Sequence, residues 1–354
     1  MTTVHVTKPY CTLKKEGDVL VIHIPEQDGQ PKQKIEVPLI KVTRVVIWGD
    51  SALTPAALAA LLEQKAEIAW LDGLGRFRGR LVPAEGKNSL LRLNQFRAHE
   101  NPTARLRLAR AFVRGKLLNA RTLLMRAARK SADEAVRQAA ERLREVVAQV
   151  DQLPHSDTPP QDPSRPQAGT VWGQLQGLEG AGTATYFDVF GRLLRADGGL
   201  RFDQRNRRPP RDPVNALLSY AYTLLMHSCA GALQACGLDP YIGFLHGSQY
   251  GKPSLALDLM EEFRAPIADS VVLTLVNNRV LTSDDFIEEF GAVRLKDESR
   301  RRFLEKFEER METEIHHPIF EYRATYRRCL ELQARLLAKA IEGELDAYPP
   351  FCVR

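Results

Sequence analysis

Cysteine is scarce in this chain of 354 residues, which contains five. The five are scattered, they are odd in number, and no two of them form a Cys-x-x-Cys pair. A zinc ribbon or a disulfide framework needs cysteines at close and regular spacing. The sequence therefore argues against both kinds of site, and we expect the cysteines to be free, buried thiols.

Long hydrophobic runs are also missing. No run approaches the roughly 18 apolar residues that a membrane-spanning helix needs. The first residues, Met-Thr-Thr-Val-His, lack the basic start and apolar core of a signal peptide. Membrane classes are therefore set aside, and we expect a cytoplasmic protein.

Repeats and low-complexity tracts are absent apart from a proline-rich stretch at residues 154–167. Because this stretch cannot hold a helix, it is predicted to be a mobile surface loop. Elsewhere, 44% hydrophobic and 27% charged residues are typical of a globular protein, and the length suffices for two domains. The net charge of +6 permits a polyanionic partner without requiring one.

The period of the hydrophobic pattern changes once along the chain. Strand-like segments with Gly-containing turns between them occur at residues 19–24, 34–38, 42–48, 68–71 and 76–82, and a helix follows Thr54. From about residue 88 the period is helical. The sequence predicts an α+β chain, with a small N-terminal mostly-β domain over residues 1–87 and a larger all-α catalytic domain over residues 88–354.

Basic residues gather in two segments. The predicted helix over residues 101–130 carries nine Lys and Arg residues and no acid, and residues 191–212 carry seven arginines. Like charges repel unless a polyanion or an acidic neighbour screens them, and the planar guanidinium suits phosphate. Contact with DNA and pairing with acids of the same chain therefore both stay open. The candidate DNA-binding residues here are Arg114, Arg121, Arg205, Arg207 and Arg208.

Residues 243–264 combine a histidine with acids on one predicted helix. His246 precedes the helix, and Ser254 is a good N-cap. At roughly 100° per residue, Asp258 and Glu261 share the face away from the leucines. Imidazole and carboxylate oxygens together are a common ligand set for a divalent metal. The alternative is a loop histidine beside a solvated acidic helix face.

Glu262 lies at the edge of the apolar stripe in the same projection. Phase therefore favours Glu261 over Glu262 as a functional acid, and we expect Glu262→Ala to be nearly silent. Phase alone also allows Glu261 to be a solvent-facing charge. Lys252 and Arg264 lie close enough in sequence to neutralise a phosphate, and they are further candidates for DNA binding.

Three blocks of sequence resemble one family, in the family's own order. Gly-Phe-Leu-His at 243–246, followed by Ser-Leu-Ala-Leu-Asp-Leu-Met-Glu-Glu-Phe-Arg at 254–264, is similar to the signature of the Cas1 family. That family comprises the CRISPR-associated endonucleases and integrases of spacer acquisition. The block at 206–220 resembles the subtype I-C form, and Gly-Leu-Glu-Gly at 177–180 resembles the place of the family's catalytic glutamate.

The resemblance implies that Glu179, His246 and Glu261 are the catalytic residues and bind Mg²⁺ or Mn²⁺, with Asp258 supporting them. Glu261 stands where some relatives carry Asp. The implied activity inserts protospacer DNA into a CRISPR array when a 3′-hydroxyl attacks a phosphodiester. The implied partners are double-stranded DNA, a second copy of the chain held through the β domain, and Cas2 in a heterohexamer.

Two rival classes remain open. In one, the protein is a non-catalytic DNA-binding scaffold whose basic segments do the binding and whose acids lie on the surface. In the other, it is a metal-dependent hydrolase of small molecules. The second is less favoured, because a small substrate does not need an extended basic surface.

Overall fold

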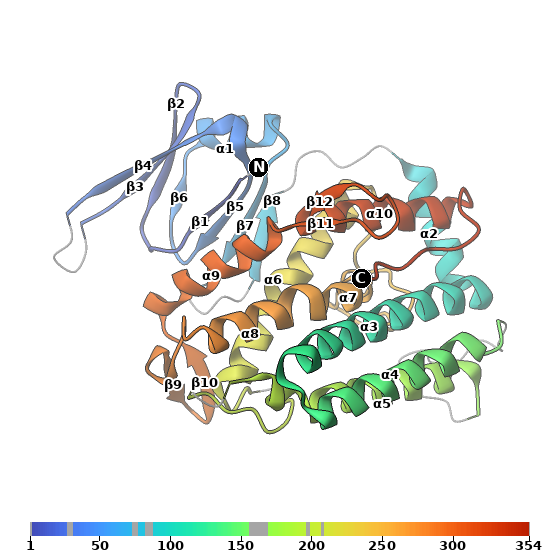
Figure 1. Ribbon diagram of the computed structural model, residues 1–354. Coiled ribbons are helices and arrows are strands. Elements are labelled where there is room, and N and C mark those ends of the chain that lie inside the picture. Colours follow the sequence, from blue (N-terminus) through green and yellow to red (C-terminus); the bar gives the residue numbers. More distant parts are fainter. Residues whose placement is uncertain are drawn as a thin grey trace. The chain divides into compact units, whose positions relative to one another are not determined.

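The computed structural model describes residues 2–26, 31–72, 77–81, 88–155, 169–195, 199–206 and 209–353. The chain forms two compact units, Met1–Glu85 and Gly86–Arg354 (Figure 1). Beyond its first two residues, the predicted proline-rich loop at 154–167 lies outside the described residues, and so do Arg207 and Arg208.

The first unit contains two four-stranded sheets. In one, β1, β5 and β7 run parallel and β8 pairs antiparallel with β7; the strands are β1 (Thr2–Val6), β5 (Val42–Trp48), β7 (Glu67–Leu71) and β8 (Phe77–Leu81). In the other, the order is β4–β3–β2–β6; the strands are β4 (Gln33–Pro38), β3 (Val19–Ile24), β2 (Thr12–Glu16) and β6 (Ala52–Leu53). A 3₁₀ turn, η1 (Leu39–Lys41), joins β4 to β5.

The predicted mostly-β character of this unit is confirmed. Strand β5 lies inside its sheet and buries four consecutive residues, from Val45 to Trp48, as a parallel strand covered on both faces does. Helix α1 (Pro55–Glu63) begins directly after Thr54, as expected. Strands β1, β2 and β6 were not predicted, because Thr, His and Lys interrupt their apolar residues or because they are very short.

The second unit is largely helical, as predicted, but it is not all-α. Its long helices are α2 (Ser89–Glu100), α3 (Pro102–Ser131), α4 (Glu134–Gln152), α5 (Val171–Asp188), α6 (Pro213–Ala235), α9 (Asp297–Met311) and α10 (Tyr326–Glu342). The shorter ones are α7 (Ser254–Phe263), α8 (Ser270–Asn277), and the 3₁₀ turns η2 (Phe190–Leu193) and η5 (Ser283–Asp285). Helices α3, α4 and α5 run side by side (Figure 1).

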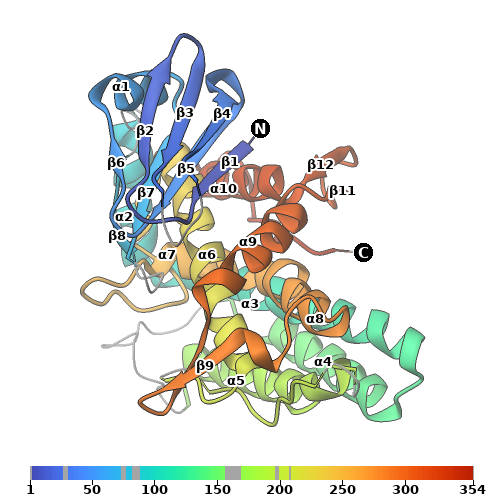
Figure 2. The ribbon, with the colours of Figure 1, turned by 90° about the vertical axis from the view of Figure 1, so that its left-hand side faces the viewer.

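Two short antiparallel hairpins correct the all-α expectation. They are β9 (Phe286–Glu289) with β10 (Ala292–Leu295), and β11 (Glu314–His316) with β12 (Arg323–Thr325); the first is seen at the lower edge of the helical unit in Figure 2. Phe290 and Gly291 connect β9 to β10, and both have positive φ, which is the backbone of a tight two-residue hairpin turn. This turn could not be predicted from the sequence, because Phe rarely adopts positive φ.

Helix α6 corrects a second expectation. It has 23 residues, and its most apolar 18-residue window reaches a mean hydropathy of 1.2, so by length and composition it could cross a membrane. Yet 56% of that window is buried inside the protein, where α6 packs against α7 and α10. This apolar run is therefore explained by its place at the centre of the helical unit.

Helix α7 lies in the interior and not on a solvated surface. Nine of its ten residues are buried, including Asp258, Glu261 and Glu262. The expected N-cap is also wrong: Pro253 caps the helix, while Ser254 is its first residue and its hydroxyl donates to the carbonyl of Gly247 at 2.8 Å. After α7 the chain widens into a π-helical turn, η4 (Arg264–Asp269). Pro266 in that turn has no N–H to offer a regular helix.

Candidate active site

Asp258 organises the loop that carries His246. Its Oδ2 accepts backbone hydrogen bonds from Phe244 at 2.6 Å and Leu245 at 3.0 Å, and its Oδ1 accepts one from His246 at 2.9 Å. Gly243 makes this wrap possible, since a Cβ there would lie 2.7 Å from Ser254 and 2.9 Å from Asp258 Oδ2. The loop and helix α7 are thus held together by one buried carboxylate.

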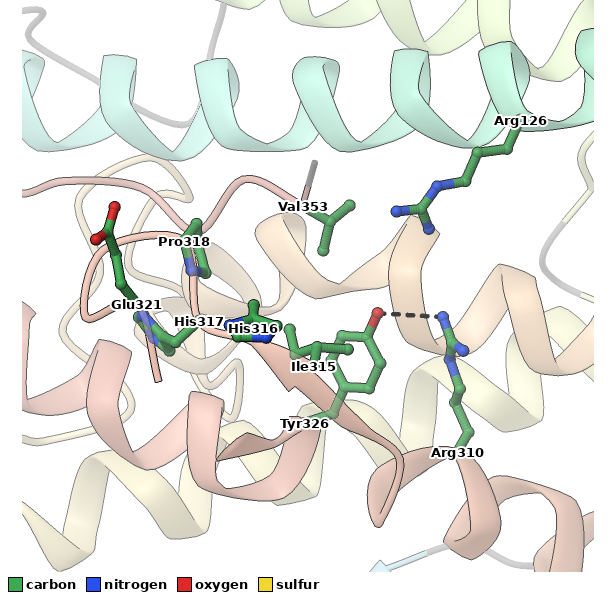
Figure 3. Close-up of a pocket in the computed structure, with 9 residues that line it drawn as sticks. All are labelled: Arg126, Arg310, Ile315, His316, His317, Pro318, Glu321, Tyr326 and Val353. Atoms are coloured by element: carbon green, nitrogen blue, oxygen red, sulfur yellow. Dashed lines mark hydrogen bonds between the residues drawn. The ribbon is translucent and has the colours of Figure 1, made fainter. Parts of the chain in front are cut away.

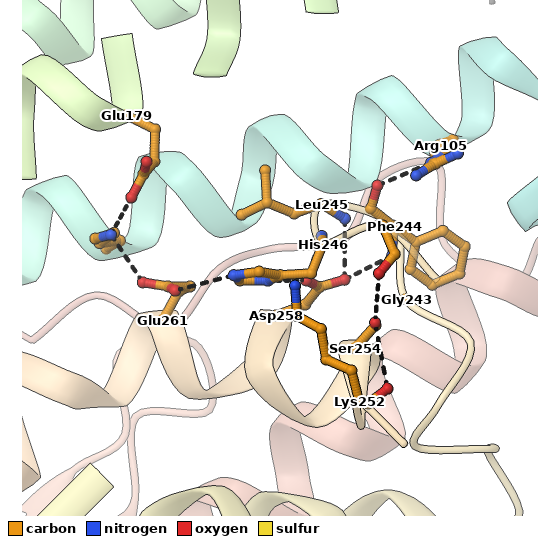
Figure 4. Close-up of polar contacts among 12 residues, drawn as sticks. Arg105, Glu179, Gly243, Phe244, Leu245, His246, Lys252, Ser254, Asp258 and Glu261 are labelled. Atoms are coloured by element: carbon orange, nitrogen blue, oxygen red, sulfur yellow. Dashed lines mark hydrogen bonds and ion pairs between the residues drawn. The ribbon is translucent and has the colours of Figure 1, made fainter. Parts of the chain in front are cut away.

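The imidazole of His246 is oriented by the same carboxylate. Its Nδ1 lies 2.7 Å from Asp258 Oδ1, and its Nε2 lies 3.7 Å from Glu261 Oε1 (Figure 4). A proton on Nδ1 donated to Asp258 leaves the Nε2 lone pair directed toward Glu261. This carboxylate–histidine arrangement is the one that proteins use to present an imidazole to a metal.

Glu261 is a buried carboxylate surrounded by cations. Arg264 Nη2 lies 2.9 Å from its Oε1, and Lys116 Nζ lies 3.0 Å from its Oε2. Burial would raise the pKa of Glu261, but the charges of Arg264, Lys116 and His246 outweigh burial and lower that pKa to about 2. The side chain is therefore an anion at neutral pH, although only 3% of it is exposed.

Glu179 joins the cluster from helix α5, as Figure 4 shows. Its Oε1 forms an ion pair with Lys116 Nζ and accepts a hydrogen bond from Thr183 Oγ1 at 3.1 Å. One ammonium on α3 therefore bridges carboxylates from α5 and α7. The structure brings the three sequence-predicted residues, Glu179, His246 and Glu261, to one place with Asp258 behind them.

The donor set fits a divalent cation, with one obstacle. Oxygen Oε2 of Glu261 is buried and lies beside the Lys116 ammonium, so the space between Glu179 and Glu261 already attracts a positive charge. Within the described residues, no group of three His, Cys, Asp or Glu side chains is close enough to hold an ion as it stands. Glu179, His246 and Glu261 could therefore hold a metal once Lys116 withdraws from between the carboxylates.

A second buried acid, Asp269, helps to hold Arg264 in place through two tyrosines. Asp269 accepts hydrogen bonds from the hydroxyls of Tyr186 at 2.8 Å and Tyr222 at 2.7 Å. The Tyr222 ring in turn carries the guanidinium of Arg264, 5.0 Å from the ring centroid. Helices α5 and α6 are thereby tied to the π-helical turn that positions Arg264 beside Glu261.

We expect this acid to make stability depend on pH. Burial raises the pKa of Asp269 to about 6, despite the tyrosine hydrogen bonds, from an ordinary 3.8. Between these pH values the folded carboxyl holds a proton that the unfolded one has lost, so the contribution of Asp269 to the unfolding free energy falls by about 2 kcal/mol as pH rises from 4 to 7. Chemical denaturation across this range should show a flatter profile for Asp269→Asn.

The control for that measurement is Asp284→Asn, since Asp284 is exposed. Its pH profile should match that of the unmodified protein. An Asp269→Asn profile as steep as the original between pH 4 and 6 would show that another group is responsible.

Glu262 corrects the expectation from helical phase. It is fully buried, and its Oε2 accepts hydrogen bonds from the Phe351 amide at 2.7 Å and from Gln333 Nε2 at 3.2 Å, outside the carboxylate cluster. Burial outweighs these bonds and raises the pKa of Glu262 to about 8. Helix α3 passes so close that a Cβ at Gly115 would lie 2.9 Å from the Glu262 side chain. Glu262 is thus a structural residue, and its removal is not expected to be silent.

The sequence matches the family model of CRISPR associated protein Cas1 over residues 4–309. This chain belongs to the Cas1 family. It is 41% identical over 354 residues to a Cas4/Cas1 fusion of Geobacter sulfurreducens, covering 99% of this chain and 60% of the fusion's length. It is 40% identical over 351 residues to a CRISPR-associated endonuclease Cas1 of Thermus thermophilus, covering 99% and 97% of the two chains. The subtype I-C assignment stays a prediction.

Solved structures share the Cas1 fold. A casposase bound to integration product superposes with a TM-score of 0.79 at 22% identity, covering 100% of this chain and 95% of the other. A CAS1 protein from Thermotoga maritima superposes with a TM-score of 0.76 at 22% identity, covering 98% and 99%. At such identities the likeness concerns the fold alone.

Four of the candidate DNA-binding residues in the described part of this Cas1 family member have partners within the chain. Arg114 Nε lies 2.9 Å from Asp151, and Arg121 lies 3.8 Å from Glu141. Arg205 donates to Asn215 Oδ1 at 2.5 Å, and Arg264 is directed to Glu261. Pairing with acids, one of the two alternatives for the basic helix, thus accounts for Arg114 and Arg121. Lys252 is half-buried, beside the start of α7.

Lys116 was missed as a site residue. It is one of nine basic residues on an acid-free helix, and nothing in the sequence distinguishes it from the other eight. Its two partners stand on helices that begin 55 and 138 residues further along, so only the packing of α3 against α5 and α7 identifies it.

Asp258→Asn is expected to weaken any binding of Mn²⁺ by this cluster, although Glu179, His246 and Glu261 all remain in place. The Asn amide would turn an N–H toward one of the backbone donors that Asp258 now accepts from, so His246 would lose its orientation. Groups of this kind typically contribute 10- to 100-fold to metal affinity, and we expect a loss of that order in a Mn²⁺ titration. Unchanged Mn²⁺ affinity in a folded Asp258→Asn protein would contradict this role.

Proposed function

We propose that this chain is a divalent-metal-dependent DNA endonuclease and strand-transfer integrase of spacer acquisition. The observation that carries the proposal is the convergence of Glu179 and Glu261 on one ammonium, with the imidazole of His246 beside Glu261. The Thermus relative is named an endonuclease, and the casposase neighbour is bound to an integration product. Both names describe chemistry on phosphodiesters, and a metal held by this donor set would supply such chemistry.

In this proposal Glu179, His246 and Glu261 hold Mg²⁺ or Mn²⁺, which would polarise the phosphodiester and stabilise charge on the attacking and leaving oxygens. Asp258 keeps the His246 proton on Nδ1, so that Nε2 stays available. Arg264 keeps Glu261 ionised and fixes its Oε1. The attacking group is the 3′-hydroxyl of a protospacer, and with water in its place the same site cleaves DNA.

Lys116 takes a specific part in this proposal, because it must leave the space between the carboxylates before a metal enters. We expect Lys116→Met to bind Mn²⁺ more tightly, by roughly tenfold, since the metal no longer displaces an ammonium. Lys116→Arg retains the positive charge and is the control, expected to bind Mn²⁺ no more tightly than the unmodified protein. Electron paramagnetic resonance of free Mn²⁺ measures both, and weaker binding by Lys116→Met would contradict the displacement.

We further propose that the chain acts on double-stranded DNA in the cytoplasm, as a homodimer that joins Cas2 in a heterohexamer. The structural neighbours include a Cas6-RT-Cas1–Cas2 complex, with a TM-score of 0.73 at 24% identity, and a Cas1–DNA complex of TM-score 0.55 at 16% identity. The exposed side chains of Ile35 and Ile40 on the β unit are apolar surface for such an interface to cover. Light scattering that detects only a monomer at micromolar concentration would contradict the dimer.

The deciding experiment is strand transfer in vitro. Purified protein, its Cas2 partner, a supercoiled CRISPR-array plasmid and a labelled protospacer are combined with Mg²⁺ or Mn²⁺. Joining of the label to the plasmid that requires the metal and is lost in Glu261→Gln supports the proposal. DNA binding without any joining, under either metal, would favour the non-catalytic scaffold.

A further inference from the structure

A polar cavity lies in the helical unit, lined by none of the residues of the carboxylate cluster. It encloses about 570 Å³ between α3, α9 and the β11–β12 hairpin, a volume within the usual range for small-molecule pockets (Figure 3). Its charged and polar walls are Arg126, Arg310, His316, His317, Glu321 and Tyr326. None of these residues belongs to the site described above.

His317 presents a buried donor without an acceptor. Its Nδ1 lies 3.2 Å from the Ile319 amide and 3.4 Å from the Phe320 amide, and both of those groups are donors. Burial lowers the pKa of His317, so the ring is neutral and its single proton is on Nε2. Only 1% of the residue is exposed, and within the described part of the chain Nε2 has no hydrogen-bond partner. An unsatisfied buried donor costs about 1–3 kcal/mol, which a bound acceptor would recover.

Arg310 and Tyr326 add donors to the same cavity. Arg310 donates through Nε and Nη2 to the carbonyl of Pro266, at 2.8 and 2.6 Å, and through Nη2 to the Tyr326 hydroxyl at 3.2 Å. These contacts fix the guanidinium and leave its Nη1 group to other acceptors. Burial raises the pKa of Tyr326, so its hydroxyl keeps a proton that it can donate.

Among the described residues that line the cavity, two carry guanidinium groups and one is an acid. Arg126 enters from α3, opposite Arg310, as Figure 3 shows. Burial lowers the pKa of Arg310, and the nearby charge of Arg126 lowers it further. Glu321 is the single acid among the described lining residues, and it is exposed. Two guanidiniums, an imidazole N–H and a phenol O–H around one space favour an anion with several acceptor oxygens.

We propose that this cavity binds a phosphate group carried by a nucleotide. The guanidiniums supply charge and paired donors, His317 and Tyr326 supply single donors, and the volume leaves room beyond the phosphate for a sugar and base. The nucleotide is either a free mononucleotide or a terminal nucleotide of a DNA strand. The site does not rest on the proposed integrase activity.

The test is isothermal titration of the full chain with 5′-dAMP and with inorganic phosphate, at constant ionic strength. The informative variant is Arg126→Gln, because Arg126 is exposed and its replacement should not disturb folding. Arg129→Gln is the matched control: it removes an exposed arginine one turn along the same helix, outside the cavity. We expect dAMP to bind the unmodified protein and Arg129→Gln alike, and Arg126→Gln at least about tenfold more weakly.

Two further measurements keep the outcome clear. In ¹⁵N-histidine spectra, dAMP should shift the Nε2–H signal that is lost in His317→Phe. Absence of binding at millimolar dAMP and phosphate, or equal binding by Arg126→Gln, would overturn the proposal. Displacement of dAMP by a short 5′-phosphorylated single strand at lower concentration assigns the site to a strand terminus, and failure to displace assigns it to a free nucleotide. Glu261→Gln should bind dAMP normally, so failure of this site and failure of the integrase proposal are distinguishable.

Discussion

Glu261→Gln is expected to abolish strand transfer, with a loss exceeding the roughly 10- to 100-fold typical of residues that only orient a ligand. The substitution preserves the size of the side chain and removes its charge. That charge is what Arg264 and Lys116 now neutralise, and it is the charge that a divalent cation would meet. The measurement is metal-dependent joining of labelled protospacer to an array plasmid, with Mn²⁺ affinity determined in parallel.

The matched control for this prediction is Glu262→Gln, at the neighbouring residue. The pKa of Glu262 is raised to about 8, so at pH 7 its side chain is mostly a neutral acid, which an amide can imitate. Glu262→Gln should therefore stay folded and active. If Glu261→Gln retains full activity while Glu262→Gln loses it, the two glutamates have been assigned the wrong roles.

Glu262→Ala is expected to lower stability strongly, by about 3 kcal/mol or more. The truncation leaves the buried Phe351 amide without its acceptor, removes one of the acceptors of Gln333, and opens a cavity beneath α3. For a unit of this size such a loss corresponds to a fall in Tm on the order of 10 °C. Thermal unfolding followed by circular dichroism measures it.

The effect should be confined to stability. At a temperature where Glu262→Ala remains folded, its Mn²⁺ affinity should be close to that of the unmodified protein, because Glu262 faces away from Glu179 and His246. An unchanged Tm for Glu262→Ala would contradict this structural role and support the expectation from helical phase, that its removal is silent.

Several local features were predictable because they depend on neighbouring residues only. The start of α1 after Thr54 follows from cap chemistry. The change from a strand period to a helical one near residue 88 follows from the spacing of apolar side chains. The Cas1 resemblance rested on contiguous blocks for the same reason, and the family match confirms it.

Which side of α7 meets water could not be predicted in this way. Helical phase gives directions around one axis, but it does not say what packs in each direction. Here α3, α6 and the segment near Phe351 enclose the helix, so that Glu261 and Glu262 are both buried and their pKa values move in opposite directions. The pKa of Glu261 is lowered because the cations Arg264 and Lys116 lie beside it. The pKa of Glu262 is raised because its neighbours are uncharged donors.

The sequence by itself determined the two-part α+β organisation, the family and the identity of the acids and histidine that converge. The tertiary structure alone decided their surroundings. Lys116 lies between Glu179 and Glu261, the loop that carries His246 is hydrogen-bonded to Asp258, and Arg114 and Arg121 pair with acids of α4. These contacts join residues between 12 and 145 positions apart. Their distances depend on how whole helices pack, which no local pattern of residues specifies.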